Sequence, residues 1–194
     1  MHKSIVIFGC ALGLLGCAHK STGGSETAAQ AAKAEPSIDA GLTGGQTAHA
    51  HLEPKSGNTT LKGHAEFAAS PVGVKLVLHV EGAPPGEHGA HIHEKGDCSD
   101  PEAKNAGGHW NPAGHQHGAP PPTSSHLGDL GNLTVGADGT GHLEVTSEGW
   151  KLGDNSAEDL LGKAVVIHGG PDDLVSDPAG NSGPRIGCGV IHND

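Results

Sequence analysis

Sixteen of the 194 residues are histidines, and the spacing of several of them is typical of metal ligands. His91 and His93 stand two positions apart. Side chains two apart on a β-strand face the same side, so both imidazoles could reach one ion. Other potential ligands follow in a short stretch and at the end of a later apolar segment: His109, His117, His126, Asp129 and His168. One histidine alone is more often an ordinary surface residue, but this set predicts a transition-metal site.

These residues lie within motifs that resemble, in order and spacing, those of the copper/zinc superoxide dismutases. The resemblance covers roughly residues 48–191, and the Gly-Asp-Cys-Ser segment at 96–99 is similar to the exported bacterial branch. The motifs are His88-Gly-Ala-His91-Ile-His93-Glu-Lys-Gly-Asp, His109-Trp-Asn-Pro, His117-Gly, His126-Leu-Gly-Asp129-Leu-Gly-Asn and Arg185-Ile-Gly-Cys188-Gly-Val-Ile.

The resemblance implies one copper and one zinc that share a histidine. Copper would be bound by His91, His93, His109 and His168. Zinc would be bound by His109, His117, His126 and Asp129. Imidazole nitrogens suit Cu(II), and three imidazoles with one carboxylate form the closed tetrahedral set of a structural zinc. The implied activity is dismutation of superoxide to oxygen and hydrogen peroxide at a redox-cycling copper, which the imidazolate of His109 would bridge to zinc.

The resemblance also implies roles for three residues around the metals. His109 would carry a proton as well as bridge the ions. Arg185 would dock the superoxide anion beside copper, and a guanidinium suits this because it is always charged and offers planar donors. Asp172 would accept hydrogen bonds from one ligand of each metal, His91 and His117, and so orient them. The segment 169–184 departs from the family pattern, because it contains three aspartates and no lysine to attract an anion.

Other interpretations of these residues remain open. The chain could be a non-catalytic envelope lipoprotein that binds copper and zinc, or a copper-only variant. Arg185 argues against the first, because a metal buffer does not need a residue that docks an anion. The complete zinc set argues against the second. Outside the motifs, His49 and His51 form another same-face pair, which could bind a spare copper ion or lie solvated at a strand edge.

The elements that must position these ligands are expected to be short β-strands. Alternating apolar residues, separated by turns rich in Gly, Pro, Asp and Asn, predict strands at Leu61–Ala68, Val74–Val80, Leu130–Val135, His142–Thr146 and Ala164–His168. No long segment has helical periodicity. The pattern predicts an all-β fold, an antiparallel Greek-key β-sandwich or barrel. Two long loops that we expect to be functional, Glu94–Ser125 and Gly169–Pro184, flank the histidines.

Residues 1–17 predict a lipoprotein signal peptide. The apolar run Ser4–Gly16 follows Lys3 and is too short to span a bilayer. It ends in Leu14-Leu15-Gly16-Cys17, which resembles the bacterial lipobox, so Cys17 would carry the lipid; a plain secretory peptide is the alternative. Residues 18–46 predict a flexible tether, and residues 47–194 the superoxide dismutase domain. The chain would then be exported and lipid-anchored to a bacterial membrane, facing the periplasm or the cell surface.

Charge and cysteine content agree with an exported protein. The formal net charge of −11 argues against nucleic acid as a partner. Of the four cysteines, Cys10 falls in the signal and Cys17 at the lipid site. Cys98 and Cys188 remain, and an even pair in an exported protein predicts a disulfide. The sequence leaves open whether the chain is a monomer or a homodimer.

Overall fold

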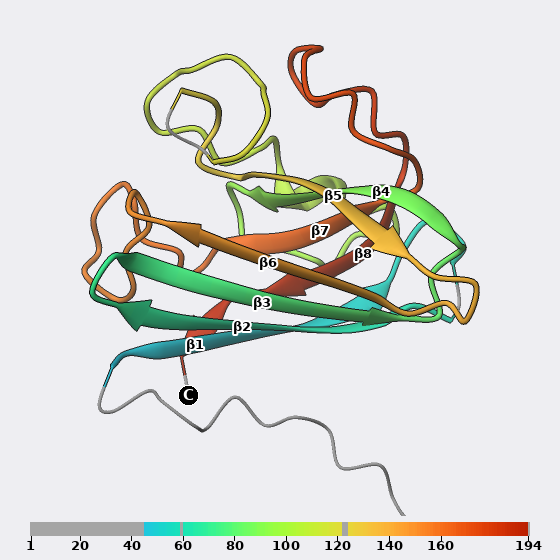
Figure 1. Cartoon of the computed structure of the whole chain (residues 1–194), viewed down its shortest axis with the longest axis horizontal. Helices are drawn as coiled ribbons and strands as arrows, with labels where there is room; N and C mark the ends of the chain where they lie inside the picture. The colour runs from blue at the N-terminus through green and yellow to red at the C-terminus, as the bar shows by residue number, and fades with distance from the viewer. Residues whose placement is uncertain (1–44, 59, 122–123, 194) are drawn as a thin grey trace, which may run out of the picture. The chain divides into compact units, whose positions relative to one another are not determined.

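The computed structural model describes residues 45–58, 60–121 and 124–193, which fold into a closed β-barrel (Figure 1). The predicted signal peptide, the lipid site at Cys17 and nearly all of the tether lie outside the described residues. Within the described part, no helix is long and apolar enough to cross a membrane.

The described residues contain nine strands and one short 3-10 helix. The strands are β1 (Thr47–Pro54), β2 (Lys62–Ser70), β3 (Gly73–Glu81), β4 (Gly86–His93), β5 (Asp129–Val135), β6 (Gly141–Ser147), β7 (Ala164–His168), β8 (Arg185–Val190) and β9 (His192–Asn193). The helix η1 (Lys104–Ala106) lies in the β4–β5 connection. All five strands predicted from alternation are present, each within two residues of its predicted ends.

The strands pair in the order β2-β3-β6-β5-β4-β7-β8-β1, and β1 also pairs with β2. That second pairing closes eight strands into a barrel. The short strand β9 pairs with β1 along the edge of β1 that faces away from β2. Every ladder between strands is antiparallel. The pairings of β3 with β6, β4 with β7 and β8 with β1 join strands that are not consecutive in sequence. The predicted all-β Greek-key fold is confirmed, in its barrel form.

The two-residue period of the sequence fills the barrel interior. In β3, Val74, Leu76, Leu78 and Val80 are buried, whereas His79 between the last two is exposed. In β2, Ala65 and Phe67 are buried from the same side. Few aromatic residues are available, so small aliphatic side chains make up most of the core, with the Phe67 ring 6.3 Å from that of Trp150. This aliphatic core is the rigid base on which the two long loops lie.

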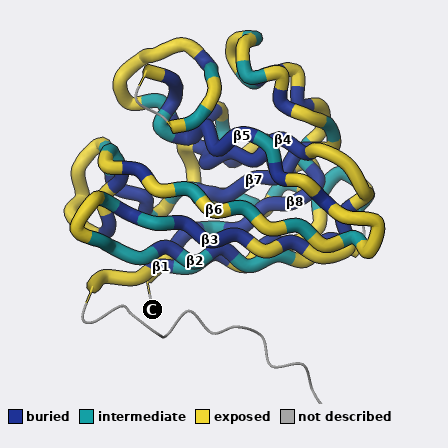
Figure 2. The backbone as a smooth tube through the Cα atoms, viewed as in Figure 1, coloured by how far each residue is buried: buried dark blue, intermediate teal, exposed yellow. Residues whose placement is uncertain are grey.

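The two predicted functional loops are the β4–β5 and β7–β8 connections, which Figure 1 shows on the β4–β5 side of the barrel. The Asp177 carboxylate accepts from the His117 amide at 2.5 Å, and the Asn132 side chain exchanges hydrogen bonds with the backbone of Asp172. The predicted disulfide is present: Cys98 in the first loop is bonded to Cys188 of β8. Figure 2 shows buried residues beneath the loops and exposed residues along their outer turns.

Candidate metal centre

Three segments bring four buried histidines together beneath the loops. His91 and His93 lie on β4, and β7 pairs with β4 through His91–Val166 and His93–Ala164, which places His168 at the end of β7 nearby. The loop residue His109 forms an isolated β-bridge with His93. Register shifts occur at His91 in the β4–β5 pair and at His168 in the β7–β8 pair. Such bulges redirect side chains, and here they occur at two of the four histidines.

One nitrogen of each of these histidines is buried without a hydrogen-bond partner. These atoms, the first ligand set, are His91 Nδ1, His93 Nε2, His109 Nε2 and His168 Nε2. The four side chains can place one ligand atom each so that all lie within 4.8 Å of one another. A buried polar atom without a partner costs about 1–3 kcal/mol. Four of them at one point are therefore explained by an ion that accepts their lone pairs.

The opposite ring nitrogens determine where those lone pairs are. His93 Nδ1 lies 3.0 Å from the Gly107 carbonyl oxygen, and His168 Nδ1 lies 3.1 Å from that of Gly183. Carbonyl oxygens only accept, so these nitrogens carry the protons and Nε2 carries the lone pair. His91 is reversed: its Nε2 donates to the Asp172 carboxylate at 2.8 Å, which leaves Nδ1 free to bind an ion.

A second ligand set surrounds one oxygen of Asp129. Its Oδ1 lies 2.9 Å from His109 Nδ1, 3.0 Å from His117 Nδ1 and 3.3 Å from His126 Nδ1. The other oxygen, Oδ2, accepts from the amides of Gly118 and His126, which holds the carboxylate in place. Three imidazole nitrogens and one carboxylate oxygen therefore converge, which is the donor set of a closed tetrahedral zinc site.

His91 is also close to this second set, within the 4.8 Å grouping that contains His109, His117 and Asp129. We assign His126 to the set instead, because His91 has no nitrogen to spare. Its Nε2 is bonded to Asp172, and its Nδ1 belongs to the first set. His109 is different, because its Nε2 is in the first set and its Nδ1 in the second. It is the one residue in the described chain that contributes a ring nitrogen to both.

Asp172 links the two sets from the β7–β8 loop. Its side chain is fully buried, with Oδ2 2.8 Å from His91 Nε2 and Oδ1 2.8 Å from His117 Nε2. Gly180 makes this packing feasible: it has φ +59, and a Cβ there would overlap Asp172 Oδ1 and press on His117 Nε2. Sequence analysis did not single out Gly180. A glycine in the same loop as Asp172 was the one available signal, and only the folded loop shows that its missing Cβ leaves room for the carboxylate.

Burial keeps the ligands in the protonation states that metal binding needs. Desolvation lowers the pKa of His109 to about 4 and that of His168 to about 3, so both imidazoles are neutral at neutral pH. Burial alone would raise the pKa of Asp172, but hydrogen bonds from His91, the Leu174 amide and His117 lower it to about 2. The orienting carboxylate is therefore ionised, and the imidazoles of His109 and His168 each carry a lone pair.

Arg185 begins β8 directly opposite His168 in the β7–β8 ladder. Its guanidinium donates to the carbonyl oxygens of Ala103 and Gly107, each at 2.6 Å. The Gly107 oxygen also accepts from His93, so one carbonyl positions both a first-set histidine and the arginine. The positive charge of Arg185 contributes to the low pKa of both His93 and His168, which shows that it acts on this centre.

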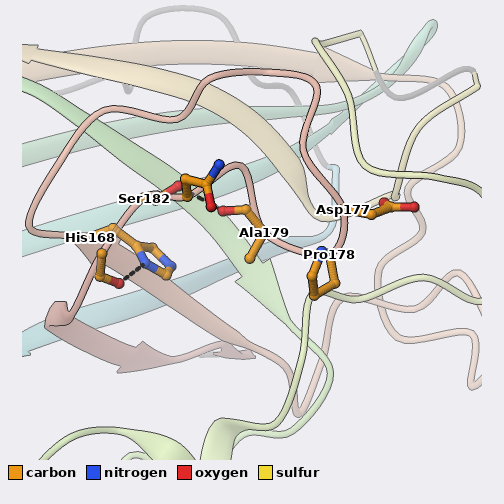
Figure 3. Close-up of a pocket in the computed structure, with 7 residues that line it drawn as sticks. His168, Asp177, Pro178, Ala179 and Ser182 are labelled. Carbon is orange, nitrogen blue, oxygen red and sulfur yellow. Dashed lines mark hydrogen bonds between the residues drawn. The ribbon is translucent and has the colours of Figure 1, made fainter.

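A pocket opens beside His168 and is bounded by the end of the β7–β8 loop. Its lining residues are His168, Asp177, Pro178, Ala179, Asn181, Ser182 and Gly183. Figure 3 shows His168 on one side of this pocket, with Pro178 and Asp177 across from it. These lining residues include no lysine or arginine, as expected for a segment without lysine, and His168 is neutral.

His88, which lies in the same motif as His91 and His93, has a different role. Its Nδ1 lies 2.8 Å from the His168 carbonyl oxygen, and its Nε2 lies 2.7 Å from that of Pro84. Both ring nitrogens are occupied, so His88 has none left for an ion. It instead holds the end of β7 against β4 and so supports the position of His168.

Most of the barrel, from β2 to β8, matches one family profile. Residues 56–191 match that of copper/zinc superoxide dismutase (SODC). The chain belongs to this family. It is therefore an enzyme that dismutates superoxide, with copper and zinc as cofactors. The non-catalytic metal-binding alternative is not favoured.

Individual copper/zinc superoxide dismutases are similar over most of the chain. Superoxide dismutase [Cu-Zn] 2 of Aquifex aeolicus is 40% identical over 158 residues, which cover 79% of this chain and 91% of the relative. Superoxide dismutase [Cu-Zn] of Deinococcus radiodurans is 39% identical over 159 residues, covering 76% of this chain and 85% of the relative.

Solved structures agree with the barrel. A SOD-like protein from Bacillus subtilis superposes with a TM-score of 0.65 at 37% identity, covering 73% of this chain and 96% of that one. The clock protein EA4 superposes with a TM-score of 0.68 at 33% identity, covering 79% of this chain and 98% of that one.

Proposed function

We propose that the first ligand set binds the catalytic copper, the second binds zinc, and His109 joins the two ions as an imidazolate. The observation that supports this most directly is the division of His109. Its Nδ1 lies among the second set at 2.9 Å from Asp129, while its Nε2 is buried without a protein partner in the first. When bound, copper supplies the one-electron redox chemistry that dismutation requires, whereas zinc is redox-silent and holds its ligands in place.

The protein's own groups bind the anion, orient the ligands and carry the proton. Arg185 is the fixed positive group next to His168, so we assign it the docking of superoxide. His109 Nε2 has no protein hydrogen-bond partner, and we assign it the uptake and release of a proton between the two half-reactions. Asp172 keeps His91 and His117 in the required tautomers, because its carboxylate accepts a hydrogen bond from the Nε2–H of each.

Metal analysis coupled to an assay of superoxide consumption tests the catalytic assignment. We expect about one copper and one zinc per chain, loss of activity when copper is removed, and recovery with copper alone among divalent ions. Full recovery with zinc alone would overturn it. The bridge has its own test, in which a second Cu(II) replaces zinc. A shared imidazolate would couple the two unpaired electrons and reduce the electron paramagnetic resonance signal, whereas two full, independent signals would exclude a bridge.

We also propose that the chain is attached to a bacterial membrane through a lipid on Cys17, which places the enzyme at the cell envelope. The support is the lipobox-like sequence, which precedes a stretch rich in small and polar residues. Replacing Cys17 with Ser is expected to move the protein from membranes to the soluble fraction and to abolish incorporation of labelled fatty acid. Unchanged fractionation with continued labelling would refute the anchor. Whether the enzyme forms a homodimer stays a prediction for sedimentation to decide.

A further inference from the structure

Six histidines outside the metal centre lie on the other half of the barrel, on β1, β2, β3, β6 and β9. They are His49, His51, His64, His79, His142 and His192. Strand register aligns four of them: His51 pairs with His64, His64 with His79, and His79 with His142. Figure 1 shows their four strands side by side. We call these six residues the outer histidine row, and the family's two metals do not require them.

The aligned imidazoles meet in two pairs through like nitrogens. His51 Nδ1 lies 3.4 Å from His64 Nδ1, and His79 Nδ1 lies 3.4 Å from His142 Nδ1. This separation is long for a hydrogen bond, whose N···O mode is about 2.9–3.0 Å. Two nitrogens bound tetrahedrally to one ion at about 2.0–2.1 Å would lie about 3.3–3.4 Å apart. In the second ligand set of the metal centre, the corresponding separation between His109 Nδ1 and His126 Nδ1 is 3.5 Å.

A carboxylate fixes the tautomer of one histidine in each pair. His64 Nε2 donates to Glu66 Oε1 at 2.9 Å, and His142 Nε2 donates to Glu144 Oε1 at 3.3 Å. A ring that donates through Nε2 carries its lone pair on Nδ1, which in both cases is the atom facing the neighbouring imidazole. A carboxylate behind a ligating histidine is the usual support of a metal site, and Asp172 provides it for His91 and His117.

The two pairs differ in how many further imidazoles surround them. The His49 ring centre lies 5.4 Å from that of His51 and 6.4 Å from that of His64, and the His192 ring lies 4.4 Å from His49. The first pair therefore has a third imidazole beside both of its rings, and His192 lies against that third ring. Around His79 and His142, the described residues show no third histidine ring in contact. β1, β2 and β9 thus bring four imidazoles together on the outer wall, where His51 and His192 are exposed and His49 and His64 are half-buried.

We propose that His51 and His64, with the neighbouring His49 ring turned toward them as a third ligand, bind an additional transition-metal ion on the outer wall of the barrel. The ion would be one that prefers imidazole, such as Zn²⁺ or Cu²⁺, and not Ca²⁺ or Mg²⁺, which prefer oxygen ligands. His79 and His142 approach each other in the same way, but among the described residues only the first pair has a further imidazole, that of His49, beside both of its rings. The site does not depend on the dismutase activity, and its test measures binding.

Titration of the full chain, already loaded with copper and zinc, tests the site by isothermal calorimetry with Zn²⁺ as the probe. The loaded enzyme is expected to take up one further Zn²⁺. The double variant His51→Gln/His64→Gln should lose this equivalent, whereas the matched variant His79→Gln/His142→Gln should keep it. Equal binding by both double variants would overturn the assignment. So would equal uptake of Ca²⁺, because it would show general attraction of cations to an acidic protein.

The orienting carboxylate gives an independent test of the ligand atom. Glu66→Gln should weaken the additional Zn²⁺ about 10-fold or more, as is typical when the partner of a ligating histidine is removed. The control is Glu53→Gln, which removes an exposed carboxylate on β1 that lies 4.0 Å from Lys55 Nζ. This variant should leave the affinity for the additional Zn²⁺ unchanged. If Glu66→Gln binds as tightly as the control, His64 does not coordinate through an oriented Nδ1 and the proposal fails.

Discussion

The histidines of the metal centre and those of the outer histidine row have similar geometry and very different surroundings. Facing nitrogens lie 3.5 Å apart in the centre and 3.4 Å apart in the row, and carboxylates orient rings in both. In the centre, however, His91 is 0% exposed and its carboxylate partner Asp172 is 4% exposed, whereas His51 and His79 of the row are exposed. Burial, more than spacing, separates the two regions.

That difference determines what each region can do without metal. Water can solvate the exposed nitrogens of the row, so an empty site there has little cost to folding. The unpartnered nitrogens of the centre are buried, and none of the described residues forms a hydrogen bond with them. Each therefore costs about 1–3 kcal/mol until an ion accepts its lone pair. Metal binding at the centre is therefore expected to stabilise the fold strongly, and binding at the row only weakly.

The largest contrast is expected when one histidine is removed from each region. His168→Gln takes away a nitrogen of the first ligand set, so copper affinity should fall more than about 100-fold, beyond the usual effect of losing an orienting partner. Superoxide consumption should fall with it. His79→Gln on the outer wall is the control and should keep both copper and activity. Copper retention by His168→Gln under chelator challenge would contradict the assignment.

The disulfide belongs to the inner region, because it ties the β4–β5 loop, which carries His109, His117 and His126, to β8. Replacing Cys98 and Cys188 together with serine releases a link between residues 90 apart in sequence. In the chain-entropy model this should lower the free energy of unfolding by about 4–5 kcal/mol. Urea denaturation of the metal-loaded chain measures it. A loss below about 1 kcal/mol would show that the loop needs no covalent tie to β8.

Replacing Asp172 with Asn tests how strongly a buried carboxylate orients the histidine ligands bonded to it. Asparagine offers one acceptor oxygen and a donor amide, so it can serve only one of His91 and His117. We expect zinc affinity to fall about 10–100-fold, with copper less affected because three of its ligands are held independently. Competition with a zinc chelator measures this, with the exposed Asp154→Asn as control. Unchanged zinc retention would mean that Asp172 does not orient His117.

The smallest expected effect concerns how superoxide is attracted. With no lysine in 169–184, the nearest lysines in the β4–β5 loop are Lys95 and Lys104, which pair with Glu94 and Glu102 and remain exposed. Reversing both to Glu should lower kcat/KM severalfold at low ionic strength and flatten its salt dependence, without loss of metal.

The matched control makes the same change in net charge on the outer wall. Lys62→Glu with Lys75→Glu should have the weaker effect, because these residues lie on β2 and β3, away from the centre. Pulse-radiolysis kinetics across a salt series distinguishes the two double variants. Equal rates in both would show that the β4–β5 lysines do not steer and that Arg185 and the bound metals attract the anion.

Much of the fold could be predicted from local sequence. The alternation in Val74–Val80 predicted β3, because a two-residue period of apolar side chains is the pattern of a β-strand with one buried face. The turn residues between such segments indicated where the strands end. β1, β4, β8 and β9 were not among the five strands predicted from alternation. β1 alternates small alanines with histidines, which is a weak apolar signal, and β9 is only two residues long. Tertiary pairing with β2 and β8 decides that β1 is a strand.

By itself, the sequence determined the ligand types, the pair of cysteines and the family, because these depend on residue identity and order along the chain. Only the tertiary structure decided which nitrogen of each histidine is available, because that depends on distant partners such as Gly107, Gly183 and Asp172. The tertiary structure also assembles the outer histidine row. His51, His64, His79 and His142 are far apart in sequence, and strand register alone brings them into line.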